Sequence, residues 1–182
     1  MDLVDLIDEK RFLGQEFLTW LWYKSDERGG TVFLPESGSD IQLVFEKHML
    51  LEYGEGEARE KVICRGLQTE LKEARTGLAM GKKLEQARVQ LIRDDHEWHL
   101  TLRGSLMEFQ SVRLPKTMAG SDESDAPEAM EARLLDQIGL YEMAVRTVDQ
   151  LYRMFLTVRT GRDWNKELSK MQAWVEKAGT LQ

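Results

Sequence analysis

The chain has 182 residues, of which 42% are hydrophobic and 31% are charged. These proportions are ordinary for a globular protein and exclude wholesale disorder. The formal charge of −7, from 25 Lys+Arg against 32 Asp+Glu, disfavours a generally basic protein that binds nucleic acid or a membrane surface, although a local basic patch stays compatible with it.

Cys64 is the single cysteine, so the sequence excludes an intrachain disulfide and a zinc site built from cysteines. Its neighbours Val62 and Ile63 favour a small buried side chain at this position. The acidic start of the chain lacks the pattern of a secretory leader, and no apolar run approaches the ~18 residues of a membrane span. We therefore expect a cytoplasmic protein without a membrane partner.

Residues 1–30 are expected to be mostly helical. Leu13, Phe17, Trp20 and Leu21 share one face at helical spacing, and Trp22 lies among further apolar residues on other sides. A helix that is apolar nearly all round is usually buried on several sides. Core packing is the favoured interpretation, and a partner interface through Trp20 and Trp22 stays open as the alternative.

Residues 31–114 predict strands around one helix. Segments 41–45 and 49–53 flank Glu46-Lys47-His48, which we interpret as a hairpin turn, and 59–65 alternates charged with apolar residues. Thr69 is a plausible N-cap for a helix over 70–80, which Gly81 ends. Three more strands are expected within 84–114, with a turn at Asp94-Asp95. The pattern favours an α+β fold with an antiparallel sheet of about six strands.

After a polar linker, the last part of the chain predicts two helices. The capping-box spacing of Asp125 and Glu128, with Pro127 between them, predicts a helix that runs to about Arg159. A heptad seam follows along it: Leu134, Ile138, Tyr141, Val145, Val148, Tyr152 and Phe155.

The same seam spacing recurs from Trp164 on a second, shorter helix. Two such helices joined by a tight turn favour a helical hairpin. Packing on the sheet or on each other is one interpretation of the two seams; dimerisation through the long helix, with Tyr141, Tyr152 and Phe155 at the interface, is the other. The expected organisation is an α+β domain over 1–114, a linker over 115–127 and a helical hairpin over 128–182.

The sequence offers little for catalysis. His96 and His99 would share a metal on a helix, but the alternation of Trp98, Leu100 and Leu102 favours a strand, on which the two histidines point to opposite faces. The glycines before Lys82 lack the spacing of a phosphate-binding loop, and the chain shows no nucleophile-elbow motif. We therefore predict no catalytic residue, no metal site and no cofactor.

Basic residues within 31–114 are candidates for contacts to a DNA backbone. This block holds 12 Lys+Arg and 14 Asp+Glu, so only their arrangement on one face would favour binding. The alternative is a solvated mixture with neighbouring glutamates such as Glu85 and Glu108. The eight candidates are Lys72, Arg75, Lys82, Lys83, Arg88, Arg93, Arg103 and Arg113.

Several segments resemble, in the same order, the C-terminal part of long, divergent members of the recombination-associated protein RdgC family. The first is the segment FLGQEFLTWLWYKS from Phe12 to Ser25. Weaker segments are ELKEAR through GKK at 70–83, EWHLTL at 97–102, RLPK at 113–116 and the helical stretch from Glu131 to Arg159. The similarity thus spans about residues 12–160.

The resemblance implies a non-catalytic bacterial or phage protein that binds duplex DNA without strong sequence preference and modulates recombination. It also implies an oligomer, since members of the family form ring-shaped dimers around DNA. No DNA-contacting residue of the family is matched to a position here. Two other functions stay open: a protein-protein interaction or assembly subunit acting with another chain, and an enzyme using the Asp95–His96 region.

Overall fold

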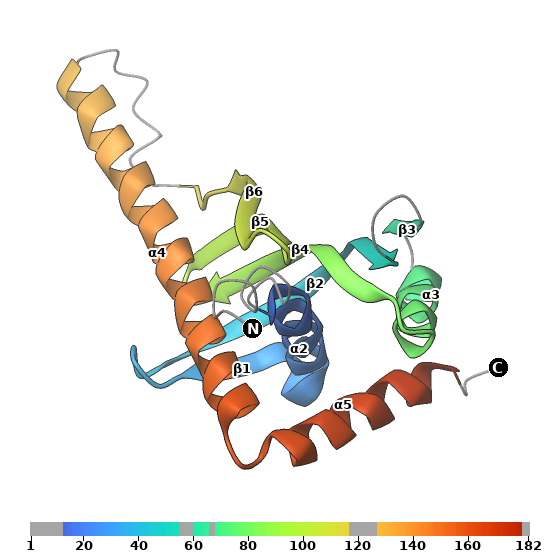
Figure 1. The fold of residues 1–182 in the computed structure, drawn as a ribbon. Helices are drawn as coiled ribbons and strands as arrows, with labels where there is room; N and C mark the ends of the chain where they lie inside the picture. Colours follow the sequence, from blue (N-terminus) through green and yellow to red (C-terminus); the bar gives the residue numbers. More distant parts are fainter. Residues whose placement is uncertain (1–12, 55–59, 66–67, 117–126, 180–182) are drawn as a thin grey trace, which may run out of the picture.

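The computed structural model describes residues 13–54, 60–65, 68–116 and 127–179, and Figure 1 shows their arrangement. The predicted α+β class with an antiparallel sheet is confirmed. Four α-helices are found in the described part of the chain: α2 (Gly14–Asp26), α3 (Gln68–Ala79), α4 (Pro127–Thr160) and α5 (Trp164–Gly179). None of these helices combines the length and the apolar character needed to cross a membrane.

The sheet among the described residues has six strands, in the order β1-β2-β4-β5-β6, with β3 paired to the same side of β2 as β1. All pairings are antiparallel. The strands are β1 (Thr31–Leu34), β2 (Ser39–Tyr53), β3 (Glu60–Arg65), β4 (Lys83–Arg93), β5 (His96–Arg103) and β6 (Glu108–Arg113).

The long strand β2 corrects one prediction from the sequence. Glu46-Lys47-His48 is not a hairpin turn, because β2 continues through it and pairs with β4 on both sides of a register shift between Phe45 and Met49. This irregularity is a β-bulge, which breaks the alternation locally without reversing the chain. The predicted total of about six strands is nevertheless correct. The structure also contains β1, a strand that the sequence pattern did not predict.

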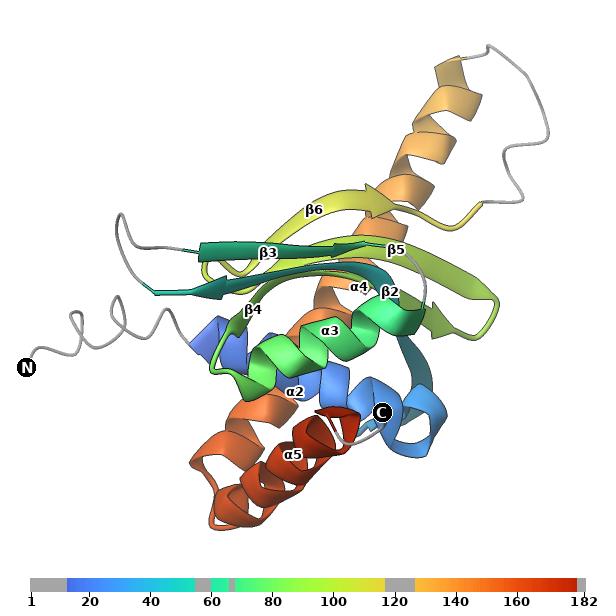
Figure 2. The same ribbon diagram turned by 90° about the vertical axis from the view of Figure 1, so that its right-hand side faces the viewer.

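Helices α2, α3 and α5 lie on one face of the sheet, and the other face is left without a helix among the described residues (Figure 2). The alternation along β4 follows from this layering, since Ala87, Val89 and Leu91 are buried toward the helices. Cys64 on β3 is buried, as predicted.

The aromatic side chains of α2 form the centre of the core. Trp20 and Phe17 pack on Phe155 of α4, with ring centroids 5.8 and 5.7 Å apart. Trp22 packs edge-on against Trp174 of α5 at 5.2 Å. Helix α2 therefore connects both C-terminal helices to the sheet, and the core interpretation of its tryptophans is correct.

The start of α2 is fixed to the sheet by a close backbone approach and a buried carboxylate. A Cβ on Gly14 would lie 1.9 Å from the carbonyl oxygen of Gly104, so only glycine fits there. Next to this crossing, the fully buried Glu85 accepts hydrogen bonds from Gln15 Nε2, at 2.7 Å, and from the hydroxyl of Ser105. Buried carboxylates need such donors, so this cluster sets the position of α2 on the sheet.

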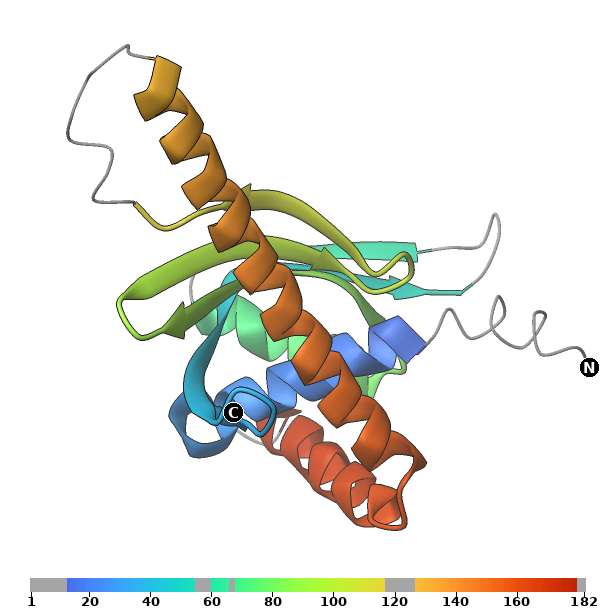
Figure 3. The same cartoon turned by 90° about the vertical axis from the view of Figure 1, so that its left-hand side faces the viewer.

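The C-terminal helices follow one another closely but diverge after the turn at 161–163 (Figures 1 and 3). Helix α5 packs mainly against α3, with smaller contacts to α4 and to α2. Trp98 Nε1 of β5 donates a 3.0 Å hydrogen bond to the carbonyl of Leu140, which holds α4 against the sheet at its midpoint. The N-terminal half of α4 projects beyond the strands (Figure 3).

Candidate functional site

The face of the sheet without a helix brings together three of the eight basic candidates. Arg88 of β4, Arg103 of β5 and Arg113 of β6 lie on this face, because Arg88 is opposite Thr101 and Arg113 is opposite His99 in the register. Side chains two residues apart on one strand share a face, so His99, Thr101 and Arg103 point the same way. The three arginines thus follow one another across the neighbouring strands β4, β5 and β6.

Carboxylates alternate with these cations. Glu46 lies between Arg88 and His99, with Oε2 2.8 Å from Arg88 Nε and Oε1 2.5 Å from His99 Nδ1. The other ring nitrogen of His99 is 2.8 Å from Glu97 Oε1.

Arg103 is held more loosely than Arg88. Its two terminal nitrogens lie 3.7 Å from Glu108 and 3.9 Å from the buried Glu85. Both distances exceed a direct hydrogen bond, so the guanidinium keeps donors for another acceptor. Arg113 is exposed at the end of β6. The open face is therefore a mixed surface in which the cations are ordered but partly neutralised.

Arg75 of α3 lies in an aromatic setting, away from the arginines of the open face. Its guanidinium lies 4.6 Å from the ring of Trp174 and 5.6 Å from that of Trp22, and it pairs with Asp26. Burial in this aromatic setting lowers the pKa of Arg75. The half-buried Arg75 joins α2, α3 and α5, which leaves less of its guanidinium for a phosphate, and its role as a phosphate contact stays a prediction.

The remaining basic candidates lie apart from the arginine row. Lys82 approaches Glu60 at 3.2 Å and the ring of Tyr53, and Lys83 is exposed at the start of β4. Arg93 is at the other end of β4, 3.9 Å from Asp94. The side chain of Lys72 lies outside the part of the molecule that is described. The eight candidates therefore do not form one surface.

Most of the predicted aromatic interface residues are core residues. Trp20, Trp22 and Phe155 are each at most 1% exposed, so their prediction as interface residues is wrong. Tyr152 is half-buried, 5.1 Å from Phe17. Tyr141, at 44% exposed, is the one predicted aromatic that presents a large surface.

The projecting half of α4 carries a row of exposed apolar side chains, which we name the α4 stripe. Its members are Met130, Leu134, Leu135, Ile138 and Tyr141, exposed by 59, 57, 60, 53 and 44%. Scattered apolar residues are normal on a surface, whereas a contiguous group marks an interaction site. The heptad seam contained three of these residues, and its 4-3 spacing was the signal that found them.

The buried side of α4 is a different row from the predicted seam. It consists of Leu140, Ala144, Thr147, Val148, Leu151 and Phe155. The seam coincides with this row only at Val148 and Phe155. The C-terminal half of α4 packs on the sheet and on α2, whereas the seam residues of its N-terminal half lie at the surface. The helix therefore has two apolar sides, of which one is covered within the chain.

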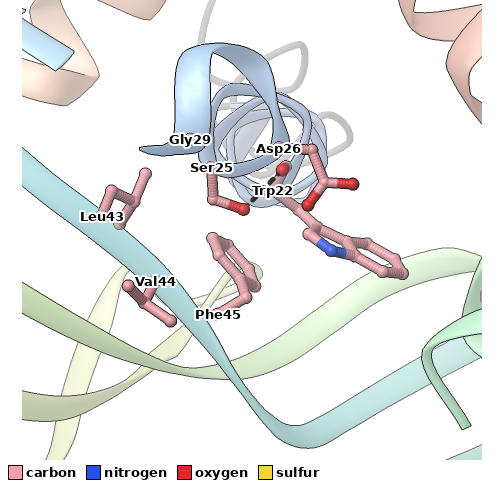
Figure 4. Close-up of a pocket in the computed structure, with 7 residues that line it drawn as sticks. All are labelled: Trp22, Ser25, Asp26, Gly29, Leu43, Val44 and Phe45. Atoms are coloured by element: carbon pink, nitrogen blue, oxygen red, sulfur yellow. Dashed lines mark hydrogen bonds between the residues drawn. The ribbon is translucent and has the colours of Figure 1, made fainter. Parts of the chain in front are cut away.

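A shallow pocket of about 420 Å³ lies between α2 and β2 (Figure 4). Its polar side chains have partners, since Ser25 donates to the carbonyl of Trp22 at 2.7 Å and Asp26 accepts from Trp174 Nε1 at 2.9 Å. The rest of the lining, including Phe45, is apolar or backbone. No nucleophile paired with a base lines it, so this pocket suggests no reaction.

The histidines of β5 lie as the strand pattern predicts. His96 stacks on Trp98, with ring centroids 5.6 Å apart, whereas His99 points to the open face. Across the described ranges, no three His, Cys, Asp or Glu residues gather in a way that could hold a metal ion.

No protein-family model matches this chain, and no curated protein or solved structure matches it either. The resemblance to the RdgC family therefore stays a prediction from the sequence.

Proposed function

We propose that this chain is a non-catalytic, RdgC-like protein that associates with duplex DNA without sequence preference, through the open face of its sheet, and so modulates recombination. The observation that carries the proposal is the row of Arg88, Arg103 and Arg113 on a face that no described helix covers. Guanidinium groups bind phosphate oxygens through paired hydrogen bonds, and the sequence resemblance supports the same ligand.

The carboxylates on this face set the expected strength of binding. A phosphate would have to compete with Glu46 for Arg88 and with Glu108 for Arg103. One copy offers about three phosphate contacts, so the logarithm of the binding constant should fall with that of the salt concentration with a slope of about −3. We therefore expect weak binding at low salt that disappears near physiological salt.

The test is fluorescence anisotropy with two labelled duplexes of unrelated sequence. The triple variant Arg88→Gln, Arg103→Gln, Arg113→Gln should lose at least about tenfold in affinity at low salt for both duplexes, with a flatter salt dependence. The matched control removes three exposed cations elsewhere, by Arg153→Gln, Arg162→Gln and Lys166→Gln. Equal losses in both variants, at equal thermal stability, or no binding by the wild type, would contradict the proposal.

The α4 stripe favours a second candidate function, an assembly subunit that acts through protein-protein contacts. Its test is Leu134→Glu, which places a charge in the centre of the stripe, with Ala132→Glu as the control on the other side of the same helix. Leu134→Glu should lower the assembly mass measured by light scattering, whereas Ala132→Glu should leave it unchanged. A wild type that is a monomer and purifies without a second protein would count against this function.

A further inference from the structure

No element in the described ranges covers the α4 stripe, although helix α4 is firmly anchored on another side. Leu140 and Leu151 face the core, whereas Leu134 and Ile138, on the projecting half, are more than half exposed. Resting on the assembly function above, we propose that the stripe is covered by a second copy of this chain, whose own α4 runs antiparallel to the first.

The size of the stripe fits pairing with itself. At the exposed fractions observed, five side chains of these types present on the order of 500 Å² of surface. Two copies placed stripe to stripe would bury about 1,000 Å², which is where specific interfaces begin. A two-fold pair uses the same patch twice, so no second surface on the molecule is needed.

Charge along the helix favours the antiparallel direction. If the two-fold axis passes between Gln137 and Ile138, Leu134 of one copy is opposite Tyr141 of the other. The same alignment brings Arg146 of each copy, which also pairs with Glu142 of its own helix at 2.6 Å, within one residue of Glu128 of the other. Two charge pairs therefore close the two ends of the apolar contact, and each helix dipole opposes the other.

A parallel pair would be unfavourable for the same reason. Between residues 127 and 142 the helix has four acidic residues, Glu128, Glu131, Asp136 and Glu142, and the single cation Arg133. In a parallel pair each of these acidic residues lies beside the same residue of the other copy, and the two helix N-termini come together. The folded body lies toward the C-terminal half of α4 (Figure 3), so a parallel pair also puts both bodies at the same end of the helix pair, whereas an antiparallel pair carries them at opposite ends.

The test is disulfide formation between full-length single-cysteine variants, made in a Cys64→Ala background. Proteins carrying Leu134→Cys and Tyr141→Cys are mixed in equal amounts and oxidised gently, and the products are identified by mass spectrometry. The antiparallel pair predicts that the mixed disulfide forms in several-fold excess over either homodisulfide. The control Ala132→Cys, on the other side of α4, should not cross-link.

Two results would overturn this inference. Preferred Leu134→Cys homodisulfides would show a parallel pair. No cross-link in any combination, together with a monomer mass for the wild type by light scattering, would remove the second copy altogether. In that second case the assembly function would survive only if Leu134→Glu, and not Ala132→Glu, released a different protein that purifies with the wild-type chain.

Discussion

At the scale of single residues, Lys24 shows how ion pairs join elements of this fold. Its Nζ lies 2.6 Å from Glu27, just after α2, and 2.6 Å from Glu167 of α5. Burial alone would lower the pKa of Lys24, but the hydrogen bonds and charges of Glu167 and Glu27 outweigh it and raise the pKa. Burial would raise the pKa of Glu27, and the bond to Lys24 reverses this and lowers it.

These shifts predict how the contribution of the Lys24–Glu27 pair depends on pH. Because folding lowers the pKa of Glu27, its carboxylate stabilises the fold at pH values above the ordinary pKa of 4.5. This contribution disappears as the pH falls through the folded-state pKa. Because folding raises the pKa of Lys24, its ammonium group stabilises the fold at pH values below the ordinary pKa of 10.5. This contribution disappears as the pH rises through the folded-state pKa.

The corresponding variant is Glu27→Gln, measured by urea unfolding across pH. We expect it to reduce the free energy of unfolding by about 0.5–1 kcal/mol at neutral pH, because the pair is partly solvated. The difference from the wild type should shrink in acid below pH 4.5 and in alkali above pH 10.5. A difference that stays constant from acid to alkali would contradict this account of the pair.

Some residues could be placed from the sequence and others could not. The burial of Trp20 and Cys64 was predictable, because large or small apolar side chains in a patterned segment seldom stay exposed. The aromatic setting of Arg75 was not, because its partners Trp22 and Trp174 are distant in the sequence and meet only when three helices pack. The same limit explains why the arginine row was not separable from the other basic residues.

At the scale of elements, the crossing of α2 over the turn after β5 depends on glycine. Gly14→Ala would force the new Cβ against the carbonyl of Gly104, a backbone atom that cannot move aside cheaply. Gly139 on α4 is the opposite case, since a Cβ there meets nothing within 4 Å. Both glycines lie in helices, so comparing an alanine substitution at each position separates the effect of helix propensity from that of packing.

We expect opposite effects from the two alanine substitutions. Gly14→Ala should destabilise the protein by about 2–3 kcal/mol through overpacking, whereas Gly139→Ala should stabilise it by about 0.5–1 kcal/mol through helix propensity. Thermal and urea unfolding measure both. A neutral Gly14→Ala would mean that α2 does not approach Gly104 this closely.

Element boundaries followed the sequence where local chemistry decides them. The end of α3 before Gly81, the turn before β5 and the start of α4 at Pro127 agree with their turn and capping signals. The N-cap prediction for Thr69 is wrong, because α3 begins at Gln68 and Thr69 lies inside the helix. The β2 strand did not, because a bulge and a turn both interrupt the alternation of apolar residues. The seam of α4 left open whether the chain or a second copy covers it, because a periodic pattern shows that a helix has an apolar side, not which neighbour covers it.

At the scale of the whole molecule, two surfaces remain after the core is accounted for, the arginine row on the sheet and the α4 stripe. They lie on different elements, so the proposed DNA contact and the proposed pairing with a second copy do not compete for the same surface. Pairing through the stripe would double the number of arginine rows in one particle. This offsets the carboxylates that weaken each row, since linked sites bind with higher avidity.

The most direct test of DNA association by an assembled protein is light scattering with and without a short duplex, at low and at near-physiological salt. We predict the mass of a dimer without DNA at both salt concentrations, because the stripe is apolar. With DNA we predict a complex of that dimer with the duplex at low salt only, because the contacts are to phosphates. A monomer that ignores DNA at low salt would contradict the account.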